Sequence, residues 1–258
     1  MIGLLVRPAD WVDEPTVVKL DSVADARIAD AVCAEITALQ TYGCRRADAL
    51  VSRTRSLMGL RLINRMRTCR VMKQQGLLHP KSSTRSDSRR AHDGEVMAEE
   101  SSQRWCSDNF EIAYDNGEVV TGVFMKDCRD REIIASCAWI GRGLPGEPVR
   151  EIMIDAVETR FGSTDERAIT VEFLSDNGGA SRAIETHALV HELGIQTVHT
   201  PLDGPQSNGM AEGFVNTFKR DYVGGMNHSS DVAVPGRLPD AFRHFNEVHL
   251  HSALGHKS

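Results

Sequence analysis

The chain has 258 residues, which is enough for one large domain or two ordinary ones with a sizeable buried core. No apolar run approaches the length of a membrane span, which argues against a membrane protein. The six cysteines contain no C-x-x-C pair, so neither a zinc site nor a redox motif is indicated. The apolar start, residues 1–6, is too short for a signal peptide, and we expect a cytoplasmic protein with reduced thiols.

The net charge of −6 is unevenly distributed along the chain. Residues 41–90 hold 13 Lys and Arg against 2 Asp and Glu, a charge of +11. The rest of the chain, with 17 bases against 34 acids, carries −17. Such asymmetry is typical of a nucleic-acid-binding part joined to an acidic part, because clustered bases neutralise phosphates. A solvated basic helix surface is the alternative explanation.

Residues 1–78 are expected to form a small all-helical domain. Apolar residues recur with helical spacing in residues 22–39, and a second helix is expected over residues 46–55. Asn64 is a good N-cap for a third helix because its side-chain oxygen can accept a backbone N–H, and Gly76 is suited to end it. This order predicts a helix-turn-helix-like domain whose last helix approaches DNA.

The third helix carries an apolar stripe among bases. Met66, Cys69 and Met72 recur at intervals of three and are expected to face the interior. The bases around this stripe are the candidate DNA-contacting residues of the domain. They are Arg65, Arg67, Arg70 and Lys73.

Residues 79–103 have the composition of a linker. Serines and charged residues dominate this segment, and large apolar residues are few. Such a stretch cannot bury much apolar surface, so we expect a polar linker between two domains here.

The pattern changes to strands at residue 104. Strands are expected over residues 104–114, 118–126 and 133–140, and Asn116-Gly117 between the first two is a strong hairpin signal. Helices are then expected over residues 150–161, 183–193 and 208–221, and strands over residues 169–174 and 195–200. Three antiparallel strands followed by alternating helices and strands is the order of a ribonuclease-H-like α/β fold with a mixed sheet. We expect it over residues 104–222.

Three carboxylates stand at informative places in this order. Asp108 lies on the first strand, Asp176 follows the fourth, and Glu212 lies early in the last helix, 35 intervening residues beyond Asp176. Mg²⁺ prefers oxygen ligands, and two such ions about 3.5–4 Å apart can drive an in-line phosphodiester displacement. If the three acids converge, the protein is a metal-dependent polynucleotidyl transferase.

The residues around the acids resemble the three catalytic blocks of insertion-sequence transposases with a retroviral-integrase-like core. The blocks are Trp105-Cys106-Ser107-Asp108, Ser175-Asp176-Asn177-Gly178 and Pro205-Gln206-Ser207-Asn208-Gly209-Met210-Ala211-Glu212. The group sometimes written "IS three", in its second reading frame, is the nearest. The resemblance implies that Asp108, Asp176 and Glu212 are catalytic and bind two Mg²⁺ or Mn²⁺ ions. It also implies that water nicks the end of the element and that the freed 3′-hydroxyl attacks a second phosphodiester.

Three further residues near Glu212 are candidate DNA contacts. Gln206 and Asn208 precede the last helix and could hold DNA near the site, with simple loop ordering as the alternative. Lys219 lies seven residues after Glu212 and therefore on the same helix face.

The resemblance also implies partners. They are double-stranded DNA, as element ends and target, and the product of the upstream reading frame, as a fusion or a separate chain. A homo-oligomer on DNA, in a bacterial cytoplasm and associated with the nucleoid, is expected. Residues 223–258 are expected to be a shortened C-terminal extension, because the block His251–Gly255 normally continues into a further helix.

Two other functions stay open at this point. A truncated, catalytically incompetent transposase could act as a DNA-binding regulator, and a ribonuclease-H-type nuclease would act on RNA–DNA hybrids. A dinucleotide fingerprint at Gly141-x-Gly143-x-x-Gly146 is discounted because it leaves the acids and the basic segment unexplained. Asp127 and Asp130 are interpreted as turn formers rather than metal ligands.

Overall fold

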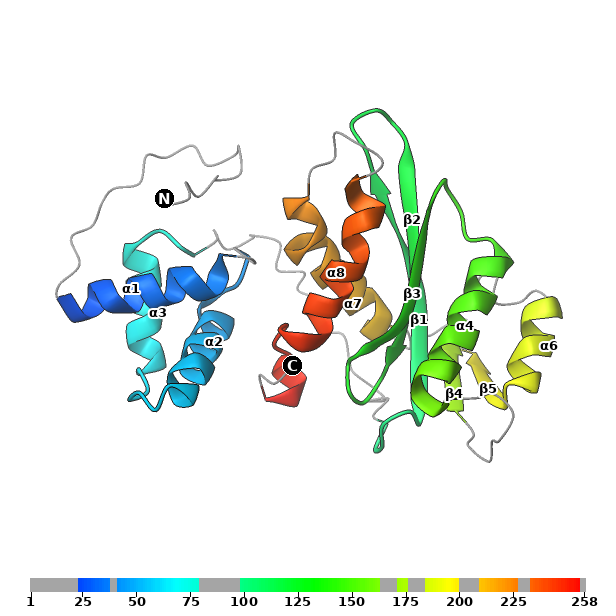
Figure 1. The fold of residues 1–258 in the computed structure, drawn as a ribbon, viewed down its shortest axis with the longest axis horizontal. Helices are drawn as coiled ribbons and strands as arrows, with labels where there is room; N and C mark the ends of the chain where they lie inside the picture. The colour runs from blue at the N-terminus through cyan, green and yellow to red at the C-terminus, as the bar shows by residue number, and fades with distance from the viewer. Residues whose placement is uncertain are drawn as a thin grey trace, which may run out of the picture. The chain divides into compact units, whose positions relative to one another are not determined.

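A computed structural model of the chain describes residues 23–37, 41–78, 98–162, 171–175, 184–199, 209–226 and 233–255. The chain divides into two compact units, Met1–Arg85 (unit 1) and Ser86–Ser258 (unit 2) (Figure 1). The division falls within the segment 79–103 that was expected to be a linker. None of the helices in the described ranges has the length and apolar character needed to cross a membrane.

The described part of unit 1 contains three helices that pack against one another. They are α1 (Val23–Ile36), α2 (Cys44–Leu57) and α3 (Arg65–Gln74). Their shared interior includes Val32, Leu50 and Val71, all buried. The side chain of Asn64 accepts a hydrogen bond from the backbone N–H of Met66 at 2.8 Å, which confirms the predicted N-cap of α3.

The buried face of α3 differs from the predicted stripe. Met66 is 71% exposed, so its predicted inward position is wrong. The buried residues are Thr68, Val71 and Met72, which share one face because they are three and four residues apart. Residues spaced only by three do not stay on one face, because a helix has 3.6 residues per turn. Thr68, rather than Met66, therefore occupies the interior position. Thr68 is tolerated there because its hydroxyl donates to Asp48 Oδ1 at 2.8 Å.

Unit 2 is built on a five-stranded sheet with the order β3-β2-β1-β4-β5 (Figure 1). The strands are β1 (Arg104–Ala113), β2 (Val119–Asp127), β3 (Ile133–Ile140), β4 (Val171–Ser175) and β5 (Ile195–His199). β1, β2 and β3 pair antiparallel, whereas β4 pairs parallel with both β1 and β5. This mixed α/β sheet confirms the predicted fold class.

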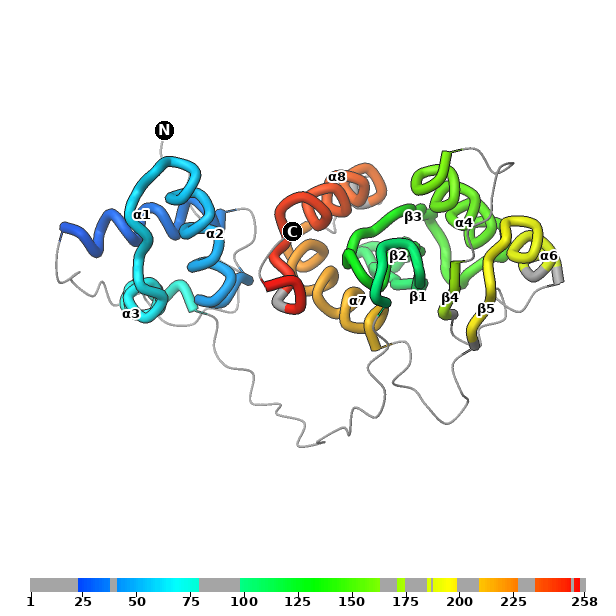
Figure 2. The backbone as a smooth tube through the Cα atoms, turned by 90° about the horizontal axis from the view of Figure 1, so that it is seen from below, coloured from blue at the N-terminus to red at the C-terminus, as the bar shows by residue number. Residues whose placement is uncertain are grey.

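Helices cover both faces of the sheet. α4 (Gly146–Phe161) and α6 (Ile184–Glu192) lie on one side, and α7 (Gly209–Asp221) and α8 (Ala233–Glu247) lie on the other (Figure 2). Side chains of a strand alternate between the two faces. Trp105 on β1 joins the apolar cluster under α4. Cys106, Asp108 and Phe110 therefore face α7, as the contact between the rings of Phe110 and Phe218 requires.

Two segments that the sequence left outside the core belong to unit 2. α8 lies in the expected C-terminal extension, yet the rings of Phe242 and Phe245 contact those of α7. The side-chain amide of Asn246 bonds both the N–H and the carbonyl of Ile133, each at 2.8 Å. At the other end, the backbone N–H of Ser102, in the expected linker, donates to Asp127 Oδ2 at 2.7 Å. The packed unit is therefore larger than residues 104–222.

Candidate active site

Asp108 lies in the middle of β1, the central strand of the sheet. Its side chain is half-buried, and its Oδ1 accepts a hydrogen bond from the backbone N–H of Asn109 at 2.8 Å. Across the ladder it pairs with Phe124 of β2, and directly paired residues project to the same face of a sheet. The carboxylate is thus presented on the face that α7 covers.

Glu212 lies in the first turn of α7 and is exposed. The opposite side of this helix is apolar, with Ala211, Phe214 and Phe218 buried. The spacing of Met210, Phe214 and Phe218, each four residues apart, predicts a buried stripe; Phe214 and Phe218 are buried, whereas Met210 is only half-buried. Burial of these rings fixes the orientation of the helix and leaves Glu212 open to solvent.

Aromatic contacts join the helix of Glu212 to the strands beside Asp108. The ring centroid of Phe214 lies 4.4 Å from that of Phe124, the residue that pairs with Asp108. Phe218 lies 5.6 Å from Phe110, which is two residues after Asp108 on the same face. Two of the three predicted carboxylates are therefore carried by elements in direct contact.

Asp176 lies outside the described residues, so the convergence of all three acids stays a prediction. The described part of β4 ends at Ser175, its covalent neighbour. Among the residues that the structure describes, no group of three or more His, Cys, Asp and Glu side chains could hold a metal ion. Asp176 is not among those residues.

The predicted DNA contacts near Glu212 are only partly described. Gln206 and Asn208 lie outside the described residues. Lys219 is exposed on α7, in its last turn. Its role as a DNA contact stays a prediction, as does that of the other two.

The predicted DNA contacts of unit 1 fall into two groups. Arg65 and Lys73 are exposed, and the described residues provide no ion pair for either. Arg67 and Arg70 instead bond the two oxygens of Asp25 on α1, at 2.7 and 2.9 Å. Asp25 is 1% exposed, so it is a buried acid whose charge is neutralised by these two guanidinium groups. Arg67 and Arg70 therefore also hold α3 against α1.

Sequence reasoning missed Lys126. It lies on β2 opposite Cys106, is 4% exposed, and points to the α7 face. Its ammonium lies 5.0 Å from the ring centroid of Phe214 and 5.6 Å from that of Phe245. Burial lowers the pKa of Lys126 to about 8, because the charged form loses its water. A lysine in a strand is normally read as a surface residue, and only the unbroken apolar run before it hinted at burial.

The histidines near the C-terminus pack with aromatic residues. His249 is buried, and its ring stacks on Phe245 with centroids 4.7 Å apart. Tyr222 Oη lies 3.1 Å from His244 Nδ1. Burial lowers the pKa of His244 and is only partly opposed by Glu247. These contacts attach the end of α7 to α8.

Asp127 and Asp130 are turn residues, as predicted. Asp127 Oδ1 accepts hydrogen bonds from the backbone N–H groups of Arg129 and Asp130 at 2.7 and 2.9 Å. Asp127 is fully buried, and its bonds close the connection between β2 and β3.

Comparison with known proteins identifies the class first. The family described as "Integrase core domain" matches residues 193–258, which span β5, α7 and α8. Together with the mixed sheet, this match indicates an integrase-type core, the class of fold that polynucleotidyl transferases use.

The full length of the chain resembles particular transposases. "Transposase InsD for insertion element IS2A/D/F/H/I/K" of Escherichia coli is 41% identical over 255 residues, covering 99% of this chain and 83% of that protein. "Transposase InsD for insertion element IS2-9" of Escherichia coli strain K12 has the same identity and coverage of this chain, and 81% of that protein is covered. The chain belongs to this family of insertion-element transposases.

Solved structures give weaker matches. The catalytic domain of Mos1 mariner transposase has 15% identity and a TM-score of 0.43, over 55% of this chain and 70% of that chain. The HTLV-2 integrase catalytic core domain in complex with magnesium has 12% identity and a TM-score of 0.44, over 59% and 91%.

Proposed function

We propose that this transposase cleaves DNA at the ends of an insertion element and joins the freed 3′-hydroxyl to a second phosphodiester, with Asp108, Asp176 and Glu212 as its catalytic carboxylates. The observation that carries the proposal is the packing of α7 on the strands that bear and flank Asp108. Glu212, an exposed acid, and Asp108, a half-buried acid of the central strand, are thus carried by two elements that pack against each other, which supports their assignment to one site.

The strand register supports the inclusion of Asp176. Cys106 on β1 pairs with Leu174 on β4, and the two strands run parallel. Asp108 and Asp176 each follow these paired residues by two positions. Because the spacing is equal, the register predicts that Asp108 and Asp176 are neighbours on the same face of the sheet. This position is at the carboxyl end of β4, where open α/β sheets build their sites.

The acids fit a divalent metal. Carboxylate oxygens are the ligands that Mg²⁺ and Mn²⁺ prefer, and we propose that the three acids hold two such ions. When bound, the ions supply activation of the attacking oxygen and stabilisation of the leaving one. The contribution of the protein is rigidity, since Asp108 is fixed by the central strand and Glu212 by a helix with a buried aromatic face.

DNA recognition is assigned to unit 1 and to the surroundings of Glu212. Arg65 and Lys73 are exposed bases of α3 for which the described residues provide no ion pair, and they are proposed to contact phosphates. Arg67 and Arg70 together carry one more charge than Asp25 neutralises, and this charge also favours DNA. Around the site, Gln206, Asn208 and Lys219 are the proposed contacts. They would hold the DNA strand beside the carboxylates.

Partners follow from the reaction. Element ends and target DNA must meet in one complex, so we propose a homo-oligomer on DNA, in a bacterial cytoplasm at the nucleoid. The product of an upstream reading frame, as a fusion or a separate chain, is the proposed pairing partner.

The test uses the purified full-length chain and end-labelled duplexes carrying the ends of the element from which it comes. Mg²⁺-dependent nicking at those ends, followed by joining, is the expected result. An RNA–DNA hybrid and a scrambled duplex are the control substrates. Cleavage of the hybrid in preference to the element end would replace the proposed function with that of a ribonuclease.

A further inference from the structure

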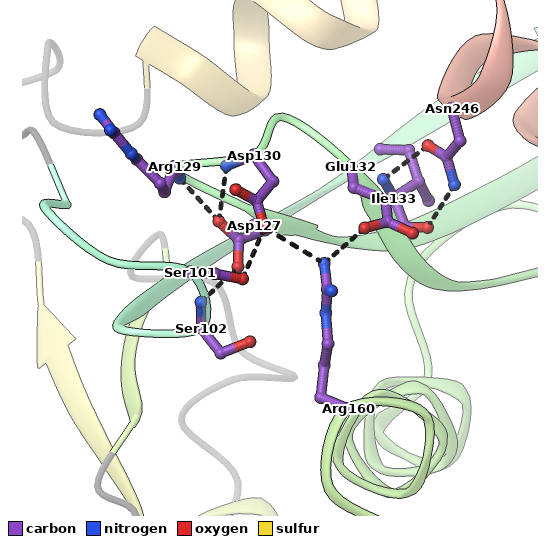
Figure 3. Close-up of polar contacts among 9 residues, drawn as sticks. All are labelled: Ser101, Ser102, Asp127, Arg129, Asp130, Glu132, Ile133, Arg160 and Asn246. Atoms are coloured by element: carbon purple, nitrogen blue, oxygen red, sulfur yellow. Dashed lines mark hydrogen bonds and ion pairs between the residues drawn. The ribbon is translucent and has the colours of Figure 1, made fainter. Parts of the chain in front are cut away.

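The connection between β2 and β3 carries two arginines, Arg129 and Arg131. Figure 3 shows Arg129 and the hydrogen bonds of Asp127 that hold this turn. The buried carboxylate of Asp127 accepts the backbone N–H groups of Arg129 and Ser102, each at 2.7 Å. Arg131 has a φ of 67°, a conformation that costs a non-glycine residue roughly 1 kcal/mol or more. Its N–H donates to the carbonyl of Asp127 at 3.1 Å, which helps to hold it there.

These arginines line an open cavity of about 700 Å³. The turn forms one wall, and Asn246 of α8 and His251 form the other. The amide of Asn246 is occupied by the backbone of Ile133, so it supports the wall. The volume is that of a site for a small molecule or a group of a larger ligand.

The acids of the cavity wall already have partners. Arg160 of α4 bonds Glu132 at 2.7 Å and lies 3.9 Å from Asp130. The hydroxyl of Ser101 donates to Asp130 at 2.5 Å (Figure 3). The negative charge of the wall is therefore partly neutralised within the fold.

The guanidinium groups of Arg129 and Arg131 lack such partners among the described residues. Among the described arginines of unit 2, Arg237 also has no ion pair with a described acid, and the others are paired with acids. The paired arginines are Arg104, Arg142, Arg150, Arg160, Arg220 and Arg243. Arg131 Nε is buried and has no hydrogen-bond acceptor, which costs free energy until a ligand provides one.

We propose that this cavity binds a phosphate group of duplex DNA at a point away from the catalytic carboxylates. Unit 2 has 16 Lys and Arg against 28 Asp and Glu, so DNA can approach it only where bases are locally free. A guanidinium group can donate two parallel hydrogen bonds to phosphate oxygens, so two arginines on one turn suit a phosphate ligand. Asp108 pairs with Phe124, three residues before Asp127, so the cavity lies roughly 10 Å along the sheet and would hold a phosphate other than the scissile one.

This inference rests on the proposed function, because it names a second contact to the same DNA. The test measures binding of the full-length chain to a fluorescent duplex by anisotropy in EDTA, over a series of salt concentrations. The variants are Arg129→Ala and Arg131→Gly, the latter because glycine adopts a positive φ without strain. Arg142→Ala is the matched control, since it removes an equal charge from an exposed arginine that already pairs with Glu111.

Each cavity variant is expected to weaken binding about tenfold at 0.1 M salt and to lower the salt slope by about 0.9, while Arg142→Ala changes neither by as much. Cavity variants that bind DNA like Arg142→Ala, with wild type still binding and cleaving, would overturn this inference and leave the proposed function standing. The same variants are also tested with a fluorescent polyglutamate peptide. If they lose affinity for this peptide but keep their affinity for DNA, the inference is overturned and the cavity is a site for an acidic protein. A wild-type chain that neither binds nor cleaves duplex DNA would contradict the proposed function itself.

Discussion

The ring of Phe214 on α7 lies 4.4 Å from the ring of Phe124 on β2, centroid to centroid. Phe124 is the ladder partner of Asp108, and Phe214 is two residues from Glu212. One buried aromatic contact therefore links the positions of two proposed catalytic acids that are more than a hundred residues apart in sequence.

The proposed carboxylates should be individually essential. Asp108→Asn, Asp176→Asn and Glu212→Gln keep the side-chain shape but remove the charge that a divalent ion requires. We expect each to reduce cleavage and joining by about 1,000-fold or more while DNA affinity changes little. Glu111→Gln, an exposed acid on the same strand as Asp108, is the control and should cleave like wild type. Cleavage retained in any amide variant would remove that residue from the site.

The Phe214 contact should couple stability to activity. Phe214→Ala deletes a buried ring that contacts Phe124, Phe218 and Phe245, and should lower the free energy of unfolding by about 3–5 kcal/mol. Under conditions where the variant is still folded, cleavage should fall because Glu212 loses its fixed position. Phe214→Leu should lose less stability and less cleavage activity than Phe214→Ala, because leucine keeps part of the buried apolar side chain. Urea unfolding and single-turnover cleavage measure the two effects, and a folded Phe214→Ala with wild-type cleavage would contradict the account.

Two arginines of α3, Arg65 and Arg67, should have different roles, one in DNA binding alone and one in both DNA binding and stability. Arg65→Ala should weaken DNA binding and lower the salt slope by about 0.9 without changing the unfolding of the protein. Arg67→Ala should also weaken binding, but it should destabilise unit 1 by about 1–2 kcal/mol, because it removes one of the two guanidinium groups that bond the buried carboxylate of Asp25. Thermal unfolding and anisotropy on both variants check this. Equal unfolding of the two would show that the Asp25 contact contributes nothing.

Lys126 should make stability depend on pH. Its pKa is about 8 in the fold and 10.5 in an exposed lysine, so below pH 8 the folded state carries the full cost of a buried charge. Between pH 8 and 10.5 the unfolded state binds more protons, and the stability of the wild type should rise with pH. Lys126→Met should therefore be more stable at pH 7, by up to about 3 kcal/mol, with a gain that shrinks towards pH 10. Urea unfolding at several pH values tests this against Lys219→Met, an exposed control that should show no such trend.

Most strands and helices of the two units follow from local patterns. The strand over residues 133–140 and the cap at Asn64 depend on neighbouring residues only, so periodicity and side-chain chemistry predict them. No local pattern predicts α8, because it contains Pro235, Gly236 and Pro239, which disfavour a helix. Its apolar face is stabilised by packing on α7. The contact between Asp25 and Arg70 joins residues 45 positions apart, and no local pattern predicts it.

Mn²⁺ binding tests most directly whether Asp108, Asp176 and Glu212 form one site. Electron paramagnetic resonance can count the Mn²⁺ ions bound to the full-length chain, with and without element-end DNA, for wild type and for the three amide variants. We predict two bound ions in the wild-type complex and a loss of binding of at least about tenfold in every variant, because each acid supplies oxygen ligands to the same ions. Glu111→Gln should bind like wild type. Unchanged Mn²⁺ binding in Glu212→Gln or Asp176→Asn would contradict the three-carboxylate site.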